Sequence, residues 1–569
     1  MKKHTKYDQE VTGAEALILS LLDEDVSIVF GYPGGAIMPV YDALYDYMEQ
    51  LNHYLVRHEQ GATHAAQGYS RVSGKAGVVF ATSGPGATNL ITGIADAQID
   101  STPLVCITGQ VASHLLGTDA FQETDVVGIS MPVTKWNIQV TKAEDIAPAI
   151  AKAFYVATSG RPGPVLVDIT KDAQFGKTVY NYEKCEGIRS YFPTPKVNAD
   201  DVKKAAAMIN AAERPFILCG HGVLLSRAEK ELLALAEKAQ IPVASTLLGL
   251  SAFPPDHTLY TGYLGMHGNY GPNLLTNACD VLIAIGMRFD DRVTGNVEKY
   301  AKQAKVIHFE IDPSEVNKII RADIAVMGDA KESLQALLPL TDKKDRTAWL
   351  NKFYDCNDVE FEKVIQKATQ PDTKNILMSE VIHQLNNLTE GSAIVVTDVG
   401  QHQMITSRYY KSKLPNHFVT SGGLGTMGFG LPAAIGAKVA LPQKQVIAVL
   451  GDGGFQMTIQ ELGTIMQSNI AVKILVLNNN FLGMVRQWQQ LFFDRRYSFT
   501  EMKNPDFIAI AKGYGIKGKK ITERKDLMNG LTEMLDSSES FLLEVVVENE
   551  ENVFPMVTTG ASVSEIILE

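Results

Sequence analysis

Short apolar runs of strand length alternate with longer stretches of helical periodicity along the whole chain of 569 residues. The runs are rich in Val, Ile and Leu, and turn-forming residues bound them. This alternation is typical of βαβ units, in which parallel strands are covered by helices on both faces. The pattern therefore predicts an α/β protein made of doubly wound parallel sheets.

The apolar runs fall into three blocks, which predict three such domains. The expected strands are residues 27–30, 54–57, 77–81, 104–108 and 165–169, then 216–219, 281–285 and 306–311, and finally 393–397, 446–450, 472–477 and 541–547. A polar, Pro-marked stretch at 182–195 and a charged, weakly patterned segment after about residue 338 separate the blocks. We expect domains at 1–185, 195–340 and 375–569. The first and third blocks share a plan without visible identity, which leaves an ancient duplication open.

Composition narrows the class of protein without naming a function. Hydrophobic residues make up 45% and charged residues 20%, the balance of an ordinary globular protein. A net charge of −12 without a basic stripe argues against nucleic acid as a partner. No apolar run approaches the roughly 18 residues of a membrane span, and no signal-peptide core opens the chain. The five scattered cysteines form no CxxC pair, so we expect a soluble, cytoplasmic protein with no membrane contact.

The third block contains a candidate metal and phosphate site. Asp452 lies among glycines directly after the run 446–450, and Asn479 follows the run 472–477, with a helical stretch at 458–467 between them. Parallel strands end at the same edge of a sheet, so the two side chains are expected to converge. A carboxylate and an amide oxygen suit Mg²⁺, and glycines let main-chain N–H groups approach phosphates. Either piece alone could be a structural turn; together they favour a metal–diphosphate site.

The first block offers one acid at a comparable place. Glu59 follows the run 54–57 and precedes a helical stretch at 62–70, so it lies at the carboxyl end of a strand, where open α/β sheets keep their sites. A lone Glu is otherwise an ordinary surface residue. The turn 83–86, before a helical run at 87–97, begins a helix near the same edge or serves only as a structural turn.

Longer motifs add a resemblance over nearly the whole chain. They are residues 31–35 (GYPGG), 57–61 (RHEQG), 83–89 (SGPGATN), 117–123 (GTDAFQE), 159–165 (SGRPGPV), 425–430 (GTMGFG) and 482–488 (LGMVRQW). In this order they resemble the catalytic subunits of acetohydroxyacid (acetolactate) synthases, which are thiamine diphosphate enzymes. The resemblance implies a transferase that decarboxylates pyruvate and joins the remainder to a second pyruvate or to 2-ketobutanoate. The products would be 2-acetolactate or 2-aceto-2-hydroxybutanoate, in valine, leucine and isoleucine biosynthesis.

The same resemblance implies a thiamine diphosphate site with Mg²⁺. The metal ligands would be Asp452, Asn479 and the main-chain carbonyl of Phe481. Cofactor contacts would come from Glu59, Gly400, Gln401, His402, Gly425, Met427, Gly453, Gly454 and Asn479. Glu59 would be the carboxyl group that activates the pyrimidine ring. Met427 would support that ring, although a Met is as readily plain core filling.

The middle block resembles the flavin-containing branch of the family, through residues 265–268 and 288–295. Contacts with FAD would come from Arg161, Gly220, Gly222, Thr246, Leu247, Met266, His267, Gly286, Arg288, Asp290, Arg292, Glu310 and Asp329. Taken without the resemblance, Asp290, Asp291 and Arg292 form a solvated charge cluster. The resemblance implies no net redox step, because members of this family require FAD for a reaction in which nothing is oxidised or reduced overall.

Further residues carry substrate roles by resemblance. Catalytic roles fall on Glu59, Gly35, Gln122 and Lys171, and substrate binding on Phe121, Arg292, Met484, Val485 and Trp488. Arg292 would grip the carboxylate of the second 2-keto acid, or else pair with Asp291. Trp488 would contact the ethyl group of 2-ketobutanoate, or else be a core aromatic residue.

Family members combine their first and third domains from different subunits, which implies a homodimer or a higher homo-oligomer. A separate small regulatory subunit is expected as well, because the chain adds no regulatory domain. Ala112 stands where many relatives have proline, and Gly454 where serine is common. These departures bear on inhibitor response and on diphosphate contacts.

Three other functions remain to be weighed. A decarboxylase or oxidase of the same fold is disfavoured because no paired histidines accompany Glu59. A flavin- or nucleotide-binding oxidoreductase is disfavoured because the sequence has no GxGxxG motif at the start of a helix. A non-catalytic binding protein would have little reason to keep Glu59, Asp452 and Asn479 together.

Overall fold

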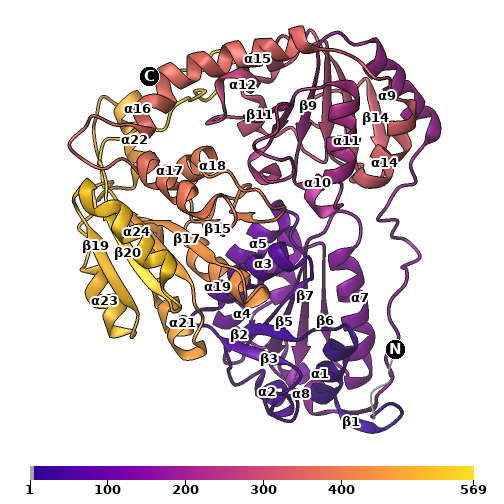
Figure 1. Cartoon of the computed structure of the whole chain (residues 1–569). Coiled ribbons are helices and arrows are strands. Elements are labelled where there is room, and N and C mark those ends of the chain that lie inside the picture. The colour runs from indigo at the N-terminus through magenta and orange to yellow at the C-terminus, as the bar shows by residue number, and fades with distance from the viewer. Residues whose placement is uncertain (1–5) are drawn as a thin grey trace.

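The computed structural model describes residues 6–569. It has three α/β domains, each with a six-stranded parallel sheet between helices, which confirms the predicted fold class. In Figure 1 the N-terminal domain lies at the bottom, the middle domain at the upper right and the C-terminal domain at the left. The polar segment 182–195 connects the first two domains along one side of the molecule.

The N-terminal sheet has the order β3-β2-β4-β5-β7-β6. Its strands are β2 (Ile28–Gly31), β3 (Asn52–Leu55), β4 (Gly77–Ala81), β5 (Leu104–Gln110), β6 (Trp136–Val140) and β7 (Pro164–Thr170). The helices are α1 (Gly13–Asp23), α2 (Met38–Tyr45), α3 (Glu59–Ser73), α4 (Pro85–Asn89), α5 (Ile91–Ile99), α6 (Val126–Ser130), α7 (Ile146–Thr158) and α8 (Lys171–Phe175). Strands β1 (Glu10–Thr12) and β8 (Lys177–Val179) form a small antiparallel pair. β3 ends two residues earlier than predicted, and α3 begins at Glu59 itself.

The middle sheet has the order β11-β10-β9-β12-β13-β14. Its strands are β9 (Pro215–Cys219), β10 (Val243–Ser245), β11 (Tyr260–Tyr263), β12 (Val281–Ile285), β13 (Lys305–Glu310) and β14 (Ile324–Met327). The helices are α9 (Ala199–Ala211), α10 (His221–Leu225), α11 (Glu229–Ala239), α12 (Tyr270–Thr276), α13 (Asp291–Thr294), α14 (Ala330–Leu337) and α15 (Thr347–Glu360). Numbered within the domain, the order is 3-2-1-4-5-6, which dinucleotide-binding sheets share. The direction of winding reverses between β9 and β12, so a ligand crevice is expected at their carboxyl ends.

The C-terminal sheet has the order β16-β15-β17-β18-β20-β19. Its strands are β15 (Ile394–Thr397), β16 (Phe418–Val419), β17 (Val446–Gly451), β18 (Lys473–Asn478), β19 (Lys517–Ile521) and β20 (Phe541–Val546). The helices are α16 (Gln366–Thr369), α17 (Met378–Thr389), α18 (Gln401–Tyr409), α19 (Gly430–Ala440), α20 (Asp452–Met457), α21 (Leu462–Ser468), α22 (Gly483–Phe492), α23 (Phe507–Gly513) and α24 (Leu527–Asp536). The expected helical stretch at 458–467 is present as the 3-10 turn Ile459–Glu461 and α21, and a further helix, α20, begins earlier, at Asp452.

The first and third sheets have the same strand order, 2-1-3-4-6-5 when each is numbered within its domain. Helices α3 and α19 follow the second strand in their respective domains and pack against each other at the centre of Figure 1. A Cβ at Gly68 would lie 1.9 Å from the Ala433 carbonyl oxygen, and one at Gly436 would lie 1.7 Å from that of Ala65. Only glycine permits this approach at either position, and the two domains share one hydrophobic core around it.

Two further observations complete the fold. Helices long and apolar enough to cross a membrane are absent from residues 6–569. All five cysteines carry free thiols.

Candidate active site

A cavity of about 1010 Å³ lies where the three domains meet. The predicted flavin residues that line it are Arg161, Gly222, Thr246, Leu247, Met266, His267, Gly286, Arg288, Asp290, Arg292, Glu310 and Asp329. The predicted cofactor and substrate residues that line it from the C-terminal domain are Gly400, Gly425, Met427, Met484, Val485 and Trp488. The cavity thus joins predicted flavin residues to part of the predicted cofactor and substrate set. The predicted cofactor residues of the C-terminal domain that do not line it are Gln401, His402, Gly453, Gly454 and Asn479.

One wall of the cavity is the crevice at the carboxyl ends of β9 and β12. The Gly222 N–H donates to the Gly286 carbonyl at 2.9 Å, and a Cβ at Gly222 would lie 2.6 Å from the Gly286 Cα. Gly286 has a φ of +56°, which favours glycine. Gly220 packs just as closely on the Gly286 carbonyl, so it supports the crevice although it does not line the cavity. With no side chains here, main chain is left free to approach a ligand.

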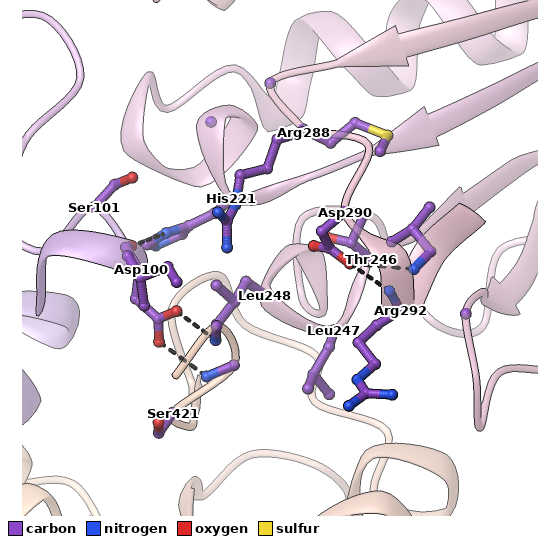
Figure 2. Close-up of a pocket in the computed structure, with 18 of the residues that line it drawn as sticks. Asp100, Ser101, His221, Thr246, Leu247, Leu248, Arg288, Asp290, Arg292 and Ser421 are labelled. Carbon is purple, nitrogen blue, oxygen red and sulfur yellow. Dashed lines mark hydrogen bonds between the residues drawn. The ribbon is translucent and has the colours of Figure 1, made fainter. Parts of the chain in front are cut away.

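Two predicted arginines of this wall differ in their contacts. The Arg161 guanidinium is already held by Asp312 at 3.3 Å and by Glu315 at 2.9 Å, which ties the N-terminal domain to the middle domain. The Arg288 guanidinium makes no hydrogen bond or ion pair with any residue between 6 and 569, and its side chain extends toward His221 in Figure 2. An uncommitted guanidinium in a glycine-walled crevice fits a phosphate-containing ligand such as FAD.

The predicted acidic residues of the middle domain accept hydrogen bonds from main-chain N–H groups. The Asp290 carboxylate accepts from the N–H groups of Arg292 and Val293, at 2.9 and 3.2 Å, and so begins helix α13 (Figure 2). Asp329 begins α14 in the same way, and Glu310 accepts from main-chain N–H groups after β13. These contacts position the cavity wall whether or not a ligand binds.

Arg292, the residue predicted to bind a substrate carboxylate, also lines the cavity. Its guanidinium lies 3.8 Å from Asp291, and both side chains are largely exposed, so that ion pair is weak. In Figure 2 the guanidinium extends away from the Asp290 carboxylate. A structural role as the partner of Asp291 is therefore poorly supported.

Trp488 and Met427 stand at the cavity wall rather than in a hydrophobic core. Both are half-buried, and the Trp488 ring packs against Phe492 with centroids 4.9 Å apart and a tilt of 41° between the rings. The Met427 methyl carbon would lie 3.6 Å from a Cβ at Gly453, which places it beside the predicted diphosphate loop. Half-burial at a cavity wall argues against the core-filling alternative for both residues.

The predicted metal site is drawn together by a residue that the sequence did not suggest. Asp452 and Asn479 follow the paired strands β17 and β18. Asn504 Nδ2 lies 2.6 Å from Asp452 Oδ2 and 2.9 Å from Asn478 Oδ1, and so joins the two connections. Asn479 Oδ1 accepts from the Phe481 N–H at 3.1 Å, which orders the turn that carries the third predicted ligand.

The electrostatics of this site fit a cation. Asp452 is buried, and burial raises its pKa to about 6. A bound divalent cation would oppose that burial cost by favouring the charged form. Within residues 6–569 no three His, Cys, Asp or Glu side chains converge on a metal site, so amide, main-chain and diphosphate oxygens would have to supplement the one carboxylate.

The surroundings also fit a diphosphate group. Burial lowers the pKa of His402 to about 3, so its ring is neutral, and His402 Nε2 has no partner among the described residues. Gln401 Oε1 accepts from Asn479 Nδ2 at 3.4 Å, which connects α18 to the metal site. A Cβ at Gly454 would lie 2.2 Å from Asp398 Oδ1. The glycine that departs from the usual serine is therefore required by its own neighbour.

Glu59 occupies a separate, largely buried place in the N-terminal domain. The His58 ring caps α3, and Glu59 Oε2 accepts from Asn89 Nδ2 at 2.9 Å. A Cβ at Gly86 would lie 3.2 Å from Glu59 Oε1, so the turn 83–86 forms the wall beside this acid.

The other predicted residues of the N-terminal domain lie outside the cavity, as Glu59 does: Gly35, Phe121, Gln122 and Lys171. The Gln122 backbone packs on Gly84, which places it beside the turn that contacts Glu59. Phe121 is 88% exposed, an unusual state for a large aromatic side chain. In one chain, these residues of the N-terminal domain are therefore separate from the cavity.

Two site residues, Asn504 and Asn89, escaped prediction. Asn89 belongs to the motif 83–89 and lies on the connection after β4, which is separated from β3 by β2 alone, and this position is the available signal. Asn504 lies in an irregular segment with no periodic pattern. Nothing in the local sequence indicates that it reaches Asp452.

Comparison with known proteins agrees with this geometry. Residues 11–129, 202–337 and 398–545 match the N-terminal TPP binding domain, the central domain and the C-terminal TPP binding domain of thiamine pyrophosphate enzymes. The chain is 46% identical to a probable acetolactate synthase large subunit of Methanocaldococcus jannaschii, over 98% of this chain and 95% of that one. It is 45% identical to the acetolactate synthase large subunit of Buchnera aphidicola from Acyrthosiphon pisum, over 98% of both chains. It is 43% identical to the acetolactate synthase isozyme 3 large subunit of Escherichia coli K12, again over 98% of both.

The chain belongs to the acetolactate synthase family of thiamine pyrophosphate enzymes. The family predicted from the motifs is thereby confirmed, as are the two thiamine pyrophosphate-binding domains. The roles assigned to single residues, and the sites for Mg²⁺ and FAD, remain predictions that the contacts above support.

Proposed function

We propose that this chain is the catalytic subunit of an acetolactate synthase. It would decarboxylate pyruvate and transfer the two-carbon remainder to a second pyruvate or to 2-ketobutanoate. The observation that carries the proposal is the single cavity on which the flavin-type crevice meets Gly425, Met427 and Trp488 of the thiamine pyrophosphate-binding domain. The names of the relatives agree with this activity.

The cofactors in this proposal are thiamine diphosphate, Mg²⁺ and FAD. Asp452, Asn479 and the Phe481 carbonyl would hold Mg²⁺, with the diphosphate beside His402 and Gly453. FAD would occupy the crevice between β9 and β12, near Arg288. When bound, thiamine diphosphate supplies a nucleophilic carbon and an electron sink for decarboxylation.

Glu59 would hold and transfer the proton on which cofactor activation depends. Its burial keeps water away from the carboxyl group, and Asn89 fixes one of its oxygens, which leaves the other to face a ligand. A positioned carboxyl group in such a role contributes about 10²- to 10⁴-fold to a rate.

Substrate selection would fall on the far side of the cavity. Arg292 would bind the carboxylate of the second 2-keto acid through two parallel hydrogen bonds. Trp488, Met484 and Val485 would form the apolar surface for its alkyl group. An extra methylene in such a pocket is worth about 1–3 kcal/mol, enough to favour 2-ketobutanoate over pyruvate by about tenfold or more.

The assembly would be at least a homodimer. Glu59, Gln122 and Lys171 do not line the cavity of their own chain, so a second copy would supply them. The relatives are named large subunits, which supports a separate small regulatory subunit for this chain as well.

Turnover of purified protein with pyruvate, alone and mixed with 2-ketobutanoate, tests the proposal. We expect 2-acetolactate from pyruvate alone, mainly 2-aceto-2-hydroxybutanoate from the mixture, and loss of both products after removal of FAD or of Mg²⁺. Acetaldehyde as the main product would identify a decarboxylase instead. Unchanged activity without FAD would remove the flavin from the proposal.

A further inference from the structure

A buried carboxylate of the C-terminal domain holds the turn that leads to Glu59. Glu461 ends the single helical turn Ile459–Glu461 and is fully buried. Its two carboxylate oxygens accept from the Arg57 N–H at 3.1 and 3.2 Å. A Cβ at Gly61 would lie 2.5 Å from Glu461 Oε1, so the carboxylate rests against the first turn of α3. The contact thus reaches the backbone on both sides of Glu59.

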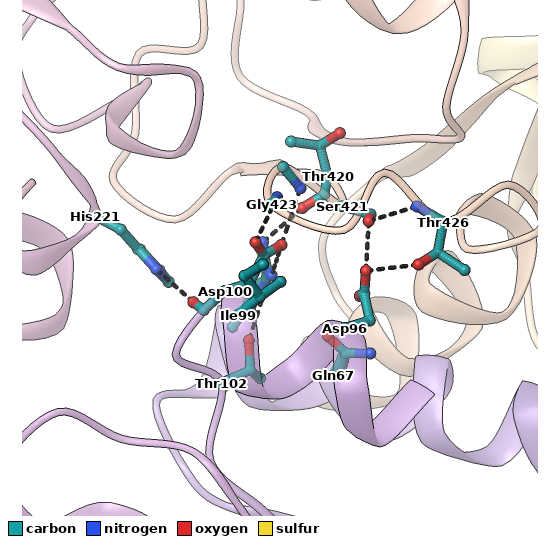
Figure 3. A network of polar contacts seen from close by, with 12 residues as sticks. Gln67, Asp96, Ile99, Asp100, Thr102, His221, Thr420, Ser421, Gly423 and Thr426 are labelled. Atoms are coloured by element: carbon teal, nitrogen blue, oxygen red, sulfur yellow. Dashed lines mark hydrogen bonds and ion pairs between the residues drawn. The ribbon is translucent and has the colours of Figure 1, made fainter. Parts of the chain in front are cut away.

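Carboxylates of the N-terminal domain hold a loop of the C-terminal domain in return (Figure 3). Asp100, at the end of α5, accepts from the N–H groups of Gly422 and Gly423 at 2.9 and 2.7 Å. Asp96, one turn earlier, accepts from the hydroxyl groups of Ser421 and Thr426. Gly425 and Met427, the predicted pyrimidine contacts, belong to the same loop.

The two sets of contacts occupy equivalent places in the two domains. Asp100 follows the third strand of its domain, β4, and Glu461 follows the third strand of its own, β17. Each reaches the connection after the second strand of the other domain, β16 or β3. The repeated strand order therefore yields a reciprocal pair of contacts across one interface.

Satisfying loop N–H groups is a sufficient role for many buried acceptors. A serine hydroxyl or a water molecule would do that without burying a charge, which is costly. Here a buried carboxylate is used on both sides of the interface, at the two loops that carry the cofactor contacts of each domain. Asp100 is also paired with the buried Arg71 guanidinium at 2.7 Å, which offsets part of its burial cost. Charge-assisted hydrogen bonds to main-chain N–H groups restrict the backbone more tightly than neutral ones.

We propose that Glu461 and Asp100 are positioning residues: each domain uses a buried carboxylate to set the loop with which the other domain contacts thiamine diphosphate. The inference rests on the proposed function for the identity of that ligand. Neither residue touches the cofactor in this account. Each acts through the loop that it holds, Glu461 on Glu59 and Asp100 on Gly425 and Met427.

Amide hydrogen exchange of the full chain, loaded with thiamine diphosphate and Mg²⁺, tests the reciprocity. Glu461→Ala should speed exchange in residues 53–60 by about 10-fold or more and leave 420–428 as in the wild type. The carboxylate accepts from the Arg57 N–H and from the Thr464 hydroxyl, and from no residue of 420–428. Asp100→Ala should speed exchange in residues 420–428 and leave residues 53–60 as in the wild type. Glu380→Ala is the control, because it removes a buried carboxylate of the C-terminal domain whose partner is Arg524. Faster exchange of both loops in each variant, or of neither, would overturn the proposal.

A second measurement follows the cofactor itself. Exchange of the thiazolium C2 proton of bound thiamine diphosphate, measured by NMR in D₂O, should slow by about 10- to 100-fold in both variants, because small displacements of reacting groups have effects of this size. An unchanged C2 exchange rate would refute the positioning role. Glu461→Gln and Asp100→Asn keep one acceptor oxygen each, should give intermediate rates, and serve if the alanine variants do not fold.

The two proposals fail in different ways. Wild-type protein that exchanges the C2 proton but forms no acetolactate from pyruvate would sink the proposed function and leave the positioning role in place. Wild-type protein that forms acetolactate, with Glu461→Ala and Asp100→Ala matching it in both exchange measurements, would sink the positioning role alone.

Discussion

Replacing Asn504 by alanine should weaken Mg²⁺ binding without unfolding the protein. Asn504 Nδ2 lies 2.6 Å from Asp452 Oδ2 and also contacts Asn478, so it fixes the only carboxylate of the predicted metal site. A hydrogen bond to a charged group contributes about 1.5–3 kcal/mol. At about 1.4 kcal/mol for each factor of ten, the Mg²⁺ concentration for half-maximal saturation should rise by roughly 10- to 150-fold.

The assay is a Mg²⁺ titration of metal-free protein at saturating thiamine diphosphate, followed by product formation. Asn375→Ala is the matched control, because Asn375 Nδ2 also donates to a carboxylate of the same domain, Glu548, at 2.7 Å, but in an exposed position away from the site. If Asn504→Ala shifts the titration no more than Asn375→Ala does, Asn504 does not align Asp452 and the reasoning fails.

Three further substitutions test other parts of the site and fold. Glu59→Gln should leave thiamine diphosphate bound in equilibrium dialysis but lower kcat by at least about 10²-fold; near-normal turnover would remove the acid from the mechanism. Trp488→Leu should lower the preference for 2-ketobutanoate in a mixed-substrate assay, and an unchanged product ratio would contradict its pocket role. Gly436→Ala would place a Cβ 1.7 Å from the Ala65 carbonyl oxygen and should cost about 1–3 kcal/mol or more in urea unfolding, whereas Gly513→Ala, with open space around it, should cost far less.

Longer strands buried on both faces were predictable from the sequence. The expected runs at 77–81 and 281–285 coincide with β4 and β12, every residue of which is buried. Among the missed strands, β6 and β19 carry polar residues and are mostly half-buried or exposed. β10 and β16 are buried but have only three and two residues, too few to show a pattern. β19 is an edge strand, and its lysines interrupt the apolar pattern by which strands are recognised. Such charges are usual on exposed sheet edges. Periodicity therefore located the sheet centres better than their edges.

Helix starts at the site were harder to predict for a physical reason. Gly453 and Gly454 have low helix propensity, so the segment after β17 was expected to be a turn. The structure makes it the first turn of α20, where Gly454 must lack a side chain because Asp398 occupies the space. Tertiary packing thus outweighs local preference at the position where phosphate is expected.

Contacts within one block were within reach of sequence reasoning, whereas contacts between blocks were not. Asp452 and Asn479 could be placed together because adjacent parallel strands end at one edge. The contacts of Glu461 with Arg57 and of Asp100 with Gly422 involve main-chain N–H groups, which any residue offers. No residue pattern marks such an acceptor, so these contacts emerge only when the domains are docked.

The direction of the two central helices supports the proposal that two copies of the chain complete the site. The contacts between Ala65 and Gly436 and between Gly68 and Ala433 show that α19 runs antiparallel to α3. Gly68 lies nine residues after Glu59, or roughly 14 Å along the helix at 1.5 Å per residue. Because α19 runs the opposite way, its beginning near Met427 lies farther still from Glu59. The proposed function, in which both residues contact one pyrimidine ring, therefore requires Glu59 to come from a second copy of the chain.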